Sequence, residues 1–89
     1  MVRLFVRHNV ANYDAWRKVY DDFGSTRSGM GVTGDAVFRG VADPSDVTIT
    51  HEFDTAQKAK AFAESAELRE AMGKAGVVGQ PQIWITATA

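Results

Sequence analysis

The hydrophobic period of this chain switches back and forth between the two-residue repeat of a strand and the longer repeat of a helix. Residues 2–9 alternate, so that Val2, Leu4, Val6 and His8 share one face. Such alternation predicts a strand with one buried face. The same reasoning predicts four strands in all, over residues 2–9, 35–42, 47–53 and 82–88.

Two helices are predicted between these strands. Asn12 is a suitable N-cap for the first, which ends before Gly24 and carries an apolar stripe of Tyr13, Trp16, Tyr20 and Phe23. Asp54 or Thr55 caps the second, which is expected to kink near Ser65 and to end at Gly76. The glycine-rich residues 24–34 are expected to form a loop, with room for one extra helical turn.

The predicted order is β-α-β-β-α-β, in a single α+β domain covering residues 1–89. Residues 43–46 (Asp-Pro-Ser-Asp) form a turn that joins the second and third strands into a hairpin. Right-handed crossovers then favour a ferredoxin-like fold. We expect a four-stranded antiparallel sheet in the order 4-1-3-2, with both helices on one face.

Composition excludes several classes of protein. The chain has no cysteine, which rules out disulfide scaffolds, thiolate nucleophiles and zinc sites that need sulfur. A net charge of −1 is unlike the basic surface of nucleic-acid-binding proteins. No apolar run approaches the roughly 20 residues of a membrane span. Arg3 and Arg7 interrupt the apolar N-terminal stretch, which is unlike a signal peptide, so a cytoplasmic location is expected.

The sheet face away from the helices is expected to carry aromatic and charged residues among threonines. Phe5 and Trp84 fall on this face, and Arg7 and Glu52 are placed to pair across it. Exposed aromatic residues on an open sheet favour coverage by another surface. A second copy of the same sheet is the predicted cover, because symmetric dimers dominate among small oligomers. A solvated face with two scattered aromatic residues is the alternative.

Three segments resemble the dimeric α/β-barrel superfamily, which includes antibiotic-biosynthesis-monooxygenase-like proteins. They are residues 8–16 (His-Asn-Val-Ala-Asn-Tyr-Asp-Ala-Trp), the turn at 43–46, and residues 68–81 around Ala75-Gly76-Val77-Val78. The resemblance covers nearly the whole chain. It implies a homodimer with facing sheets, and a small-molecule cleft between each sheet and its helices. Members include cofactor-independent oxygenases of aromatic substrates, haem-degrading enzymes and cyclases, so the fold alone does not determine the reaction.

His8 is the candidate catalytic residue. It is expected to end the first strand on the helix-facing side, where an apolar pocket has one titratable group at its rim. A neutral imidazole can take a proton from a phenol or an enolisable carbon, and the resulting carbanion would react directly with oxygen. The purely structural alternative is a histidine that ends a strand and bonds to a nearby carbonyl.

The other candidates are expected to bind substrate or to build the core. His51 lies on the same sheet face, roughly 12–15 Å from His8 along antiparallel strands, so the two cannot share a metal ion. No metal or other cofactor is therefore predicted. His51 and Arg27 together could hold an anionic group at the start of the second helix, although a structural role is favoured. The residues proposed to line the substrate site are Tyr13, Trp16, Tyr20, Met72, His51 and Arg27.

Three functions are compatible with these features. The first is a cofactor-independent monooxygenase or cyclase acting on a phenolic or enolisable, polyketide-like compound. The second is a non-catalytic dimer, ligand-binding or stress-related, that uses the same cleft for a small apolar or aromatic molecule. The third is an RNA-binding module, which the fold order allows but which the charge and the absence of aromatic residues at Thr48 and Thr50 disfavour.

Overall fold

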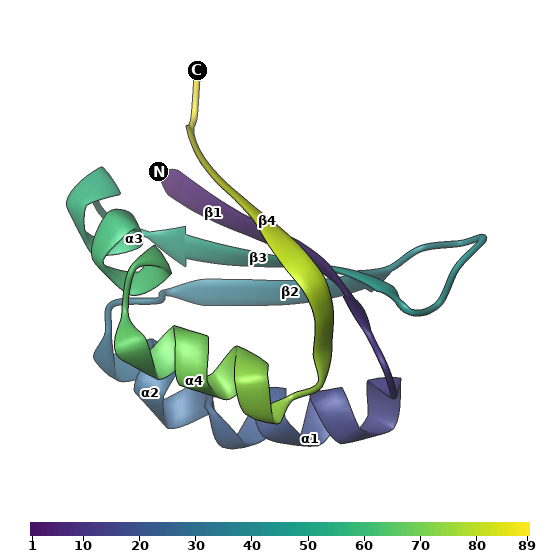
Figure 1. Ribbon diagram of the computed structural model, residues 1–89. Helices are drawn as coiled ribbons and strands as arrows, with labels where there is room; N and C mark the ends of the chain where they lie inside the picture. The colour runs from purple at the N-terminus through teal and green to yellow at the C-terminus, as the bar shows by residue number, and fades with distance from the viewer.

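The computed structural model describes residues 1–89 and contains one four-stranded antiparallel sheet with four helices (Figure 1). The sheet order is β2-β3-β1-β4, which confirms the predicted ferredoxin-like arrangement. The elements are β1 (Val2–Val10), α1 (Tyr13–Asp22), α2 (Gly24–Gly29), β2 (Gly34–Arg39), β3 (Asp46–Phe53), α3 (Ala56–Ala63), α4 (Ala66–Lys74) and β4 (Val77–Ala87). None of the helices is long and apolar enough to cross a membrane.

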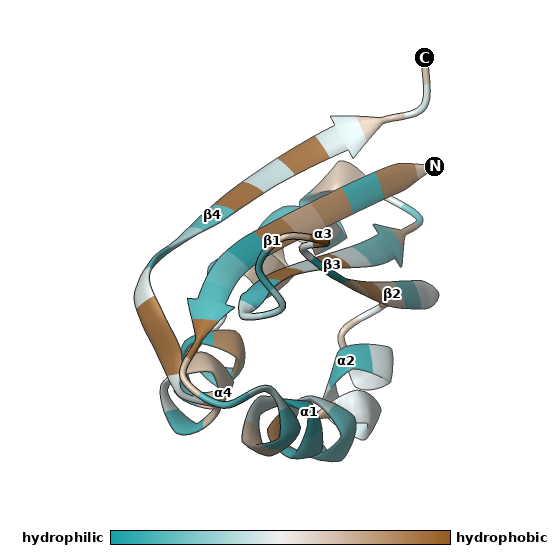
Figure 2. Cartoon of the chain, turned by 90° about the vertical axis from the view of Figure 1, so that its right-hand side faces the viewer, coloured by the Kyte–Doolittle hydropathy of each residue, from teal (hydrophilic) through white to brown (hydrophobic).

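The two central strands define the buried face of the sheet. Alternate residues of β1 are buried from Val2 to Val10, and the same alternation runs along β3 from Val47 to Phe53. The helices cover this inner face, with α1, α2 and α4 lying together below the strands in Figure 1. Brown and pale residues alternate along β4 in Figure 2, as expected for a strand with two unlike faces.

Local hydrogen bonds explain where the helices begin. The Asn12 side chain accepts a hydrogen bond from the Ala15 amide at 3.0 Å, which caps α1 as predicted. Thr55, rather than Asp54, caps α3 by accepting from the Lys58 amide. Gly76 has a φ of +76°, and its carbonyl accepts from the Ala11 amide at 3.1 Å. This bond joins the residue that follows α4 to the loop that precedes α1.

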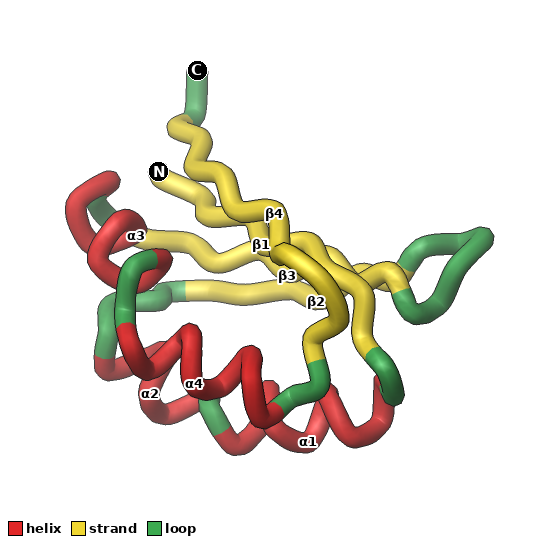
Figure 3. The backbone as a smooth tube through the Cα atoms, in the orientation of Figure 1, coloured by secondary structure: helices red, strands yellow, loops and turns green.

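Four elements differ from the sequence-based prediction. Strand β2 ends at Arg39, three residues before the predicted end. Residues 24–29 form the helix α2, which is longer than the one extra turn allowed within the predicted loop. The expected kink near Ser65 is a complete break, because the Ser65 hydroxyl caps a new helix by accepting from the Leu68 amide. Strand β4 begins at Val77, five residues before the predicted start, and includes Pro81. The β2–β3 loop projects away from the sheet, as Figure 3 shows.

The ion pairs on the outer face also differ from the prediction. Arg7 donates two hydrogen bonds to Asp46, at 3.1 and 2.7 Å, whereas Glu52 pairs with Arg3 at 2.8 Å. The strand register causes this exchange, because Arg3 lies directly opposite Glu52 and Arg7 lies diagonally across from Asp46. The predicted pair between Arg7 and Glu52 is therefore wrong.

Phe62 of α3 joins several parts of the core. Its ring is fully buried and lies 5.6 Å from the ring of Phe53, 6.3 Å from Phe23 and 5.1 Å from His51. A buried aromatic side chain with partners on a central strand and at the junction of two helices leaves a large void when it is truncated.

Truncation of this ring is therefore expected to be costly. Phe62→Ala should lower the free energy of unfolding by about 3–5 kcal/mol, measured by urea denaturation followed by circular dichroism. Val41→Ala is the control, because Val41 is fully exposed in the β2–β3 loop. Its effect should stay below about 1 kcal/mol. Equal losses for the two variants would show that Phe62 does not organise the core.

Candidate functional site

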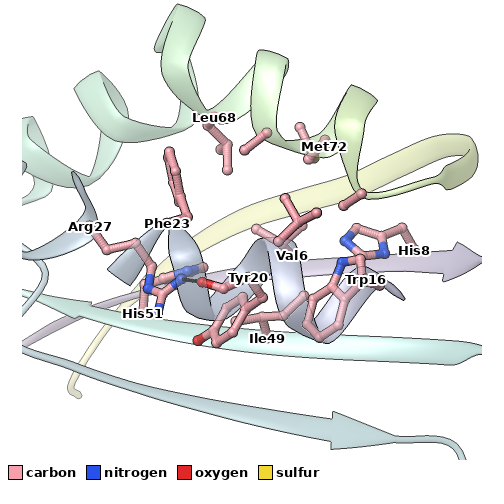
Figure 4. A pocket seen from close by; sticks show the side chains of 13 residues that line it. Val6, His8, Trp16, Tyr20, Phe23, Arg27, Ile49, His51, Leu68 and Met72 are labelled. Atoms are coloured by element: carbon pink, nitrogen blue, oxygen red, sulfur yellow. Dashed lines mark hydrogen bonds between the residues drawn. The ribbon is translucent and has the colours of Figure 1, made fainter. Parts of the chain in front are cut away.

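A cavity lies between the inner face of the sheet and the helices α1 and α4. Its volume is about 40 Å³, and ten of its 13 lining residues are hydrophobic. Side chains from both central strands and from both helices point into it in Figure 4. The lining residues are Val6, His8, Trp16, Val19, Tyr20, Phe23, Arg27, Ile49, His51, Leu68, Ala71, Met72 and Ala75.

His8 forms one end of this cavity. It is 6% exposed, and its ring meets the edge of Trp16 at 5.9 Å between centroids. The Nδ1 atom is buried and has no hydrogen-bond partner. Burial lowers the pKa of the imidazole below its ordinary value, and the backbone of His8 and, to a smaller extent, the charge of Asp46 oppose this shift in part. His8 is therefore a neutral imidazole at pH 7 with a nitrogen free to accept or donate.

His51 lines the other end, as the strand register requires. Leu4 lies opposite His51 and Val47 lies opposite His8, so the two imidazoles are four residues apart along the sheet. His51 is 3% exposed, and its Nδ1 atom also lacks a partner. Burial lowers its pKa to about 4, with a smaller contribution from the positive charge of Arg27. No cluster of three or more metal-ligating side chains is present.

A polar network surrounds the His51 end. The Arg27 guanidinium lies 3.8 Å from the centroid of the Tyr20 ring and donates to the Tyr20 carbonyl. The Tyr20 hydroxyl donates to Asp35, whose carboxylate is 3.9 Å from the Arg27 guanidinium. Burial and then the Asp35 hydrogen bond raise the pKa of Tyr20, so it stays a phenol. The network fixes a positive charge beside the cavity while leaving His51 neutral.

The structure gathers most of the predicted site residues around one cavity. His8, Trp16, Tyr20, Met72, His51 and Arg27 all line it. Tyr13 does not. Its ring packs on Trp16 at 5.7 Å and lies beneath the Arg39 guanidinium at 3.7 Å.

Sequence reasoning missed one polar member of this region. Asp35 was not singled out, although it pairs with His51 in the strand register and receives the Tyr20 hydroxyl. The sequence feature that identifies Asp35 is its position at the start of a predicted strand, two residues before Val37 and therefore on the same face as Val37.

The low pKa of His51 links folding to pH. Below pH 6.5 the unfolded chain takes up a proton at residue 51, whereas the folded chain does not until about pH 4. Stability supplied by the neutral imidazole should thus be present above pH 6.5 and be lost as the pH falls toward 4. The loss attributable to His51 should be on the order of 3 kcal/mol by pH 4.

The matched variant is His51→Gln, which keeps a polar side chain that does not titrate. Urea denaturation at several pH values should give a shallower loss of stability for the variant between pH 6.5 and 4. Both proteins keep His8 and all carboxylates, so the difference between the curves reports on residue 51. Parallel curves would contradict the shifted pKa, and titration of the imidazole by NMR gives a direct check.

Comparison with known proteins gives structural relatives only. No family model matches the chain, and no curated protein matches it. A candidate antibiotic biosynthesis monooxygenase from Bordetella bronchiseptica superposes with a TM-score of 0.82 at 15% identity, covering 99% of this chain and 96% of that chain. A second such protein, from Caulobacter crescentus, gives 0.78 at 13% identity, with coverages of 99% and 89%.

A third relative has a named activity. SnoaB, a cofactor-independent oxygenase from Streptomyces nogalater, superposes with a TM-score of 0.80 at 6% identity, covering 99% of this chain and 92% of that chain. Identities this low establish the fold and leave the chemistry open. The resemblance in the sequence is confirmed at that level: this chain has the ferredoxin-like fold of the antibiotic-biosynthesis-monooxygenase-like proteins.

Proposed function

We propose that this protein is a cofactor-independent monooxygenase of small phenolic or enolisable molecules, with His8 as its catalytic base. The observation that carries this proposal is a neutral, buried imidazole with an unpartnered nitrogen in an otherwise apolar cavity. A base of this kind acts on weakly acidic C–H or O–H groups at neutral pH. The activity named for SnoaB supports the same class of reaction.

The proposed reaction oxidises an activated methylene group to a ketone. His8 removes one proton, and the resulting carbanion transfers electrons to dioxygen and forms a C–O bond. The imidazolium releases its proton to water, and the peroxide anion takes up a proton from water. Loss of the second C–H proton and cleavage of the O–O bond then give the ketone and one water. Each substrate consumes one O₂, with four electrons passing from carbon to oxygen, so no further reductant is needed.

The cavity must widen for such a substrate to bind. Its volume of about 40 Å³ holds no more than a few water molecules, whereas sites for organic ligands occupy roughly 300–1,000 Å³. Met72 and Leu68 form part of the α4 wall, and the flexible thioether of Met72 can change its shape at low cost. The break at Ser65 separates α4 from α3, so α4 can shift as a unit of its own.

Replacement of His8 tests the catalytic role. With anthrone as the probe substrate, we expect oxygen uptake and formation of the quinone by the unmodified protein. His8→Gln should reduce kcat by a factor of about 10²–10⁴, since general-base catalysis contributes that much. Circular dichroism and thermal denaturation provide the control for folding.

The outcomes separate the competing functions. Turnover that survives in the variant would exclude His8 as the base. Product formed without oxygen uptake would indicate a cyclase. Saturable binding of phenols and enolisable ketones with no product from any of them would identify a non-catalytic ligand-binding protein.

The protein is proposed to act as a homodimer joined through the outer face of the sheet. Phe5 and Trp84 stack on this face with 5.1 Å between ring centroids and 1° between ring planes, and Trp84 is 42% exposed. A stable interface buries roughly 800 Å² on each partner, which the total surface of 5398 Å² readily supplies. Aromatic residues are enriched in such interfaces.

A charge placed at this centre should dissociate the dimer. Trp84→Glu is expected to halve the mass measured by analytical ultracentrifugation at micromolar concentration, because a buried unpaired carboxylate is costly. Val41→Glu is the control, since Val41 is fully exposed in the β2–β3 loop. A monomeric unmodified protein, or a dimer unaffected by Trp84→Glu, would contradict this assembly.

A further inference from the structure

The ladder between β1 and β4 is interrupted at His8. Arg7 lies opposite Gln82, but Asn9 lies opposite Val78, so three residues of β4 face a single residue of β1. Gly79 has a φ of +77°, which accommodates the bulge. Pairing resumes on both sides of this point, and the bend in β4 can be followed in Figure 1.

A polar hollow lies at the same place. Its volume is about 330 Å³, and only one of its eight lining residues is hydrophobic. His8 belongs to the lining of this hollow as well as to that of the apolar cavity. The remaining lining residues are Arg7, Asn9, Asp43, Asp46, Val78, Gln80 and Gln82.

The charged groups facing His8 all belong to the hollow. They are Arg7, Asp43 and Asp46, of which Arg7 and Asp46 are joined by two hydrogen bonds. Residues of α1 and α4 that line the cavity carry no charge, and the one charged cavity residue, Arg27, lies at the His51 end. Electrostatic coupling between His8 and Asp46 appears in both pKa shifts: Asp46 raises the pKa of His8, and His8 lowers that of Asp46.

The opposite end of the sheet provides an internal comparison. Arg3 and Glu52 form a similar ion pair on the outer face, and Glu52 is adjacent to His51 in sequence. There the ladders on both sides of β1 are continuous, with Leu4 paired to His51 and to Ile85. The pKa of His51 is lowered by burial and by Arg27, and Asp35 opposes the shift. Of the two ion pairs on the outer face, the one that contains Asp46 is electrostatically coupled to a buried imidazole, and it lies beside the break in the β1–β4 ladder.

We propose that the break in the β1–β4 ladder is a proton route through the sheet, along which His8 exchanges protons between the inner cavity and the outer polar hollow. Asp46 and Arg7 are the positioning residues of this route. The proposal rests on the proposed function, in which His8 takes a proton from the substrate. The apolar residues around His8 in the cavity cannot accept that proton from it. The imidazolium releases that proton to water in the hollow, and the imidazole becomes neutral again.

Titration of His8 by NMR tests the coupling without requiring turnover. Asp46→Asn leaves Arg7 without its partner and should lower the pKa of His8 below that of the unmodified protein. Arg7→Gln leaves Asp46 without its partner and should raise it. Glu52→Gln is the control and should leave the pKa of His8 unchanged. Shifts in the same direction for the first two variants, or no shift beyond that of the control, would overturn the proposal.

Chemical labelling tests the route itself. Diethyl pyrocarbonate reacts with neutral imidazole, and mass spectrometry locates the label on each histidine. At pH 7 we expect His8 to react several-fold faster than His51, although the two are almost equally buried. Gln82→Phe, which places a larger side chain in the hollow, should slow the labelling of His8 alone. Equal rates for the two histidines, or no effect of Gln82→Phe, would show that no route exists.

If turnover is found, the pH profile gives a further readout. The acidic limb of kcat/KM should move to lower pH in Asp46→Asn by the shift that NMR measures for His8. A limb that stays in place while the His8 pKa moves would show that protons leave the site another way. Absence of turnover with every substrate would count against the proposed function, whereas the pKa and labelling results would still decide on the route.

Discussion

The structure depends on burying one face of the two central strands. Leu4 and Val47 are completely buried, and every second residue of β1 and β3 follows them beneath the helices. A strand cannot turn a single residue to the other face without changing its register. The same alternation that buries the aliphatic residues therefore also buries His8 and His51. The Nδ1 atom of each imidazole has no hydrogen-bond partner there. Burial of the core thus also buries the two imidazoles that line the cavity.

The two ends of the cavity differ in how firmly they are built. The His51 end is held by Phe62 and by the Tyr20, Asp35 and Arg27 network, in which each polar group has a partner except the imidazole. The His8 end has only aromatic and aliphatic neighbours on the helix side and a broken ladder on the strand side. The His51 end is thus fixed by charged and hydrogen-bonded groups, whereas the His8 end borders a gap in the β1–β4 ladder.

Much of the fold could be predicted from the sequence because its strands alternate cleanly. The inward orientation of both histidines followed from this pattern alone. Helix α2 was missed because its sequence, Gly-Ser-Thr-Arg-Ser-Gly, has no apolar stripe, and Arg27 is held instead by Tyr20 and Asp35. Residues 77–81 lie outside the predicted fourth strand, because Gly79 and Pro81 disfavour strands. Of these residues only Val77 and Val78 pair with β1, and that pairing is a tertiary effect.

The site was predictable in part for the same reason. A helical stripe from Tyr13 to Phe23 identifies residues that face the sheet, but it does not distinguish those over the cavity from those at its edge. Tyr13 lies in the first turn and is covered by Arg39 from the edge strand β2. The partner of Arg7 depends on the register between β1 and β3. No local sequence pattern specifies that register, so the ion pair with Asp46 was not predicted.

The shape of β4 also limits how this protein can meet its neighbours. β4 is an edge strand, and an open edge invites pairing with strands of other chains. Pro81 offers no amide hydrogen, and the bulge at Gly79 bends the backbone out of line. The opposite edge, β2, is only six residues long. Both edges of the sheet therefore discourage its extension by strands of other chains, which is how fibres grow.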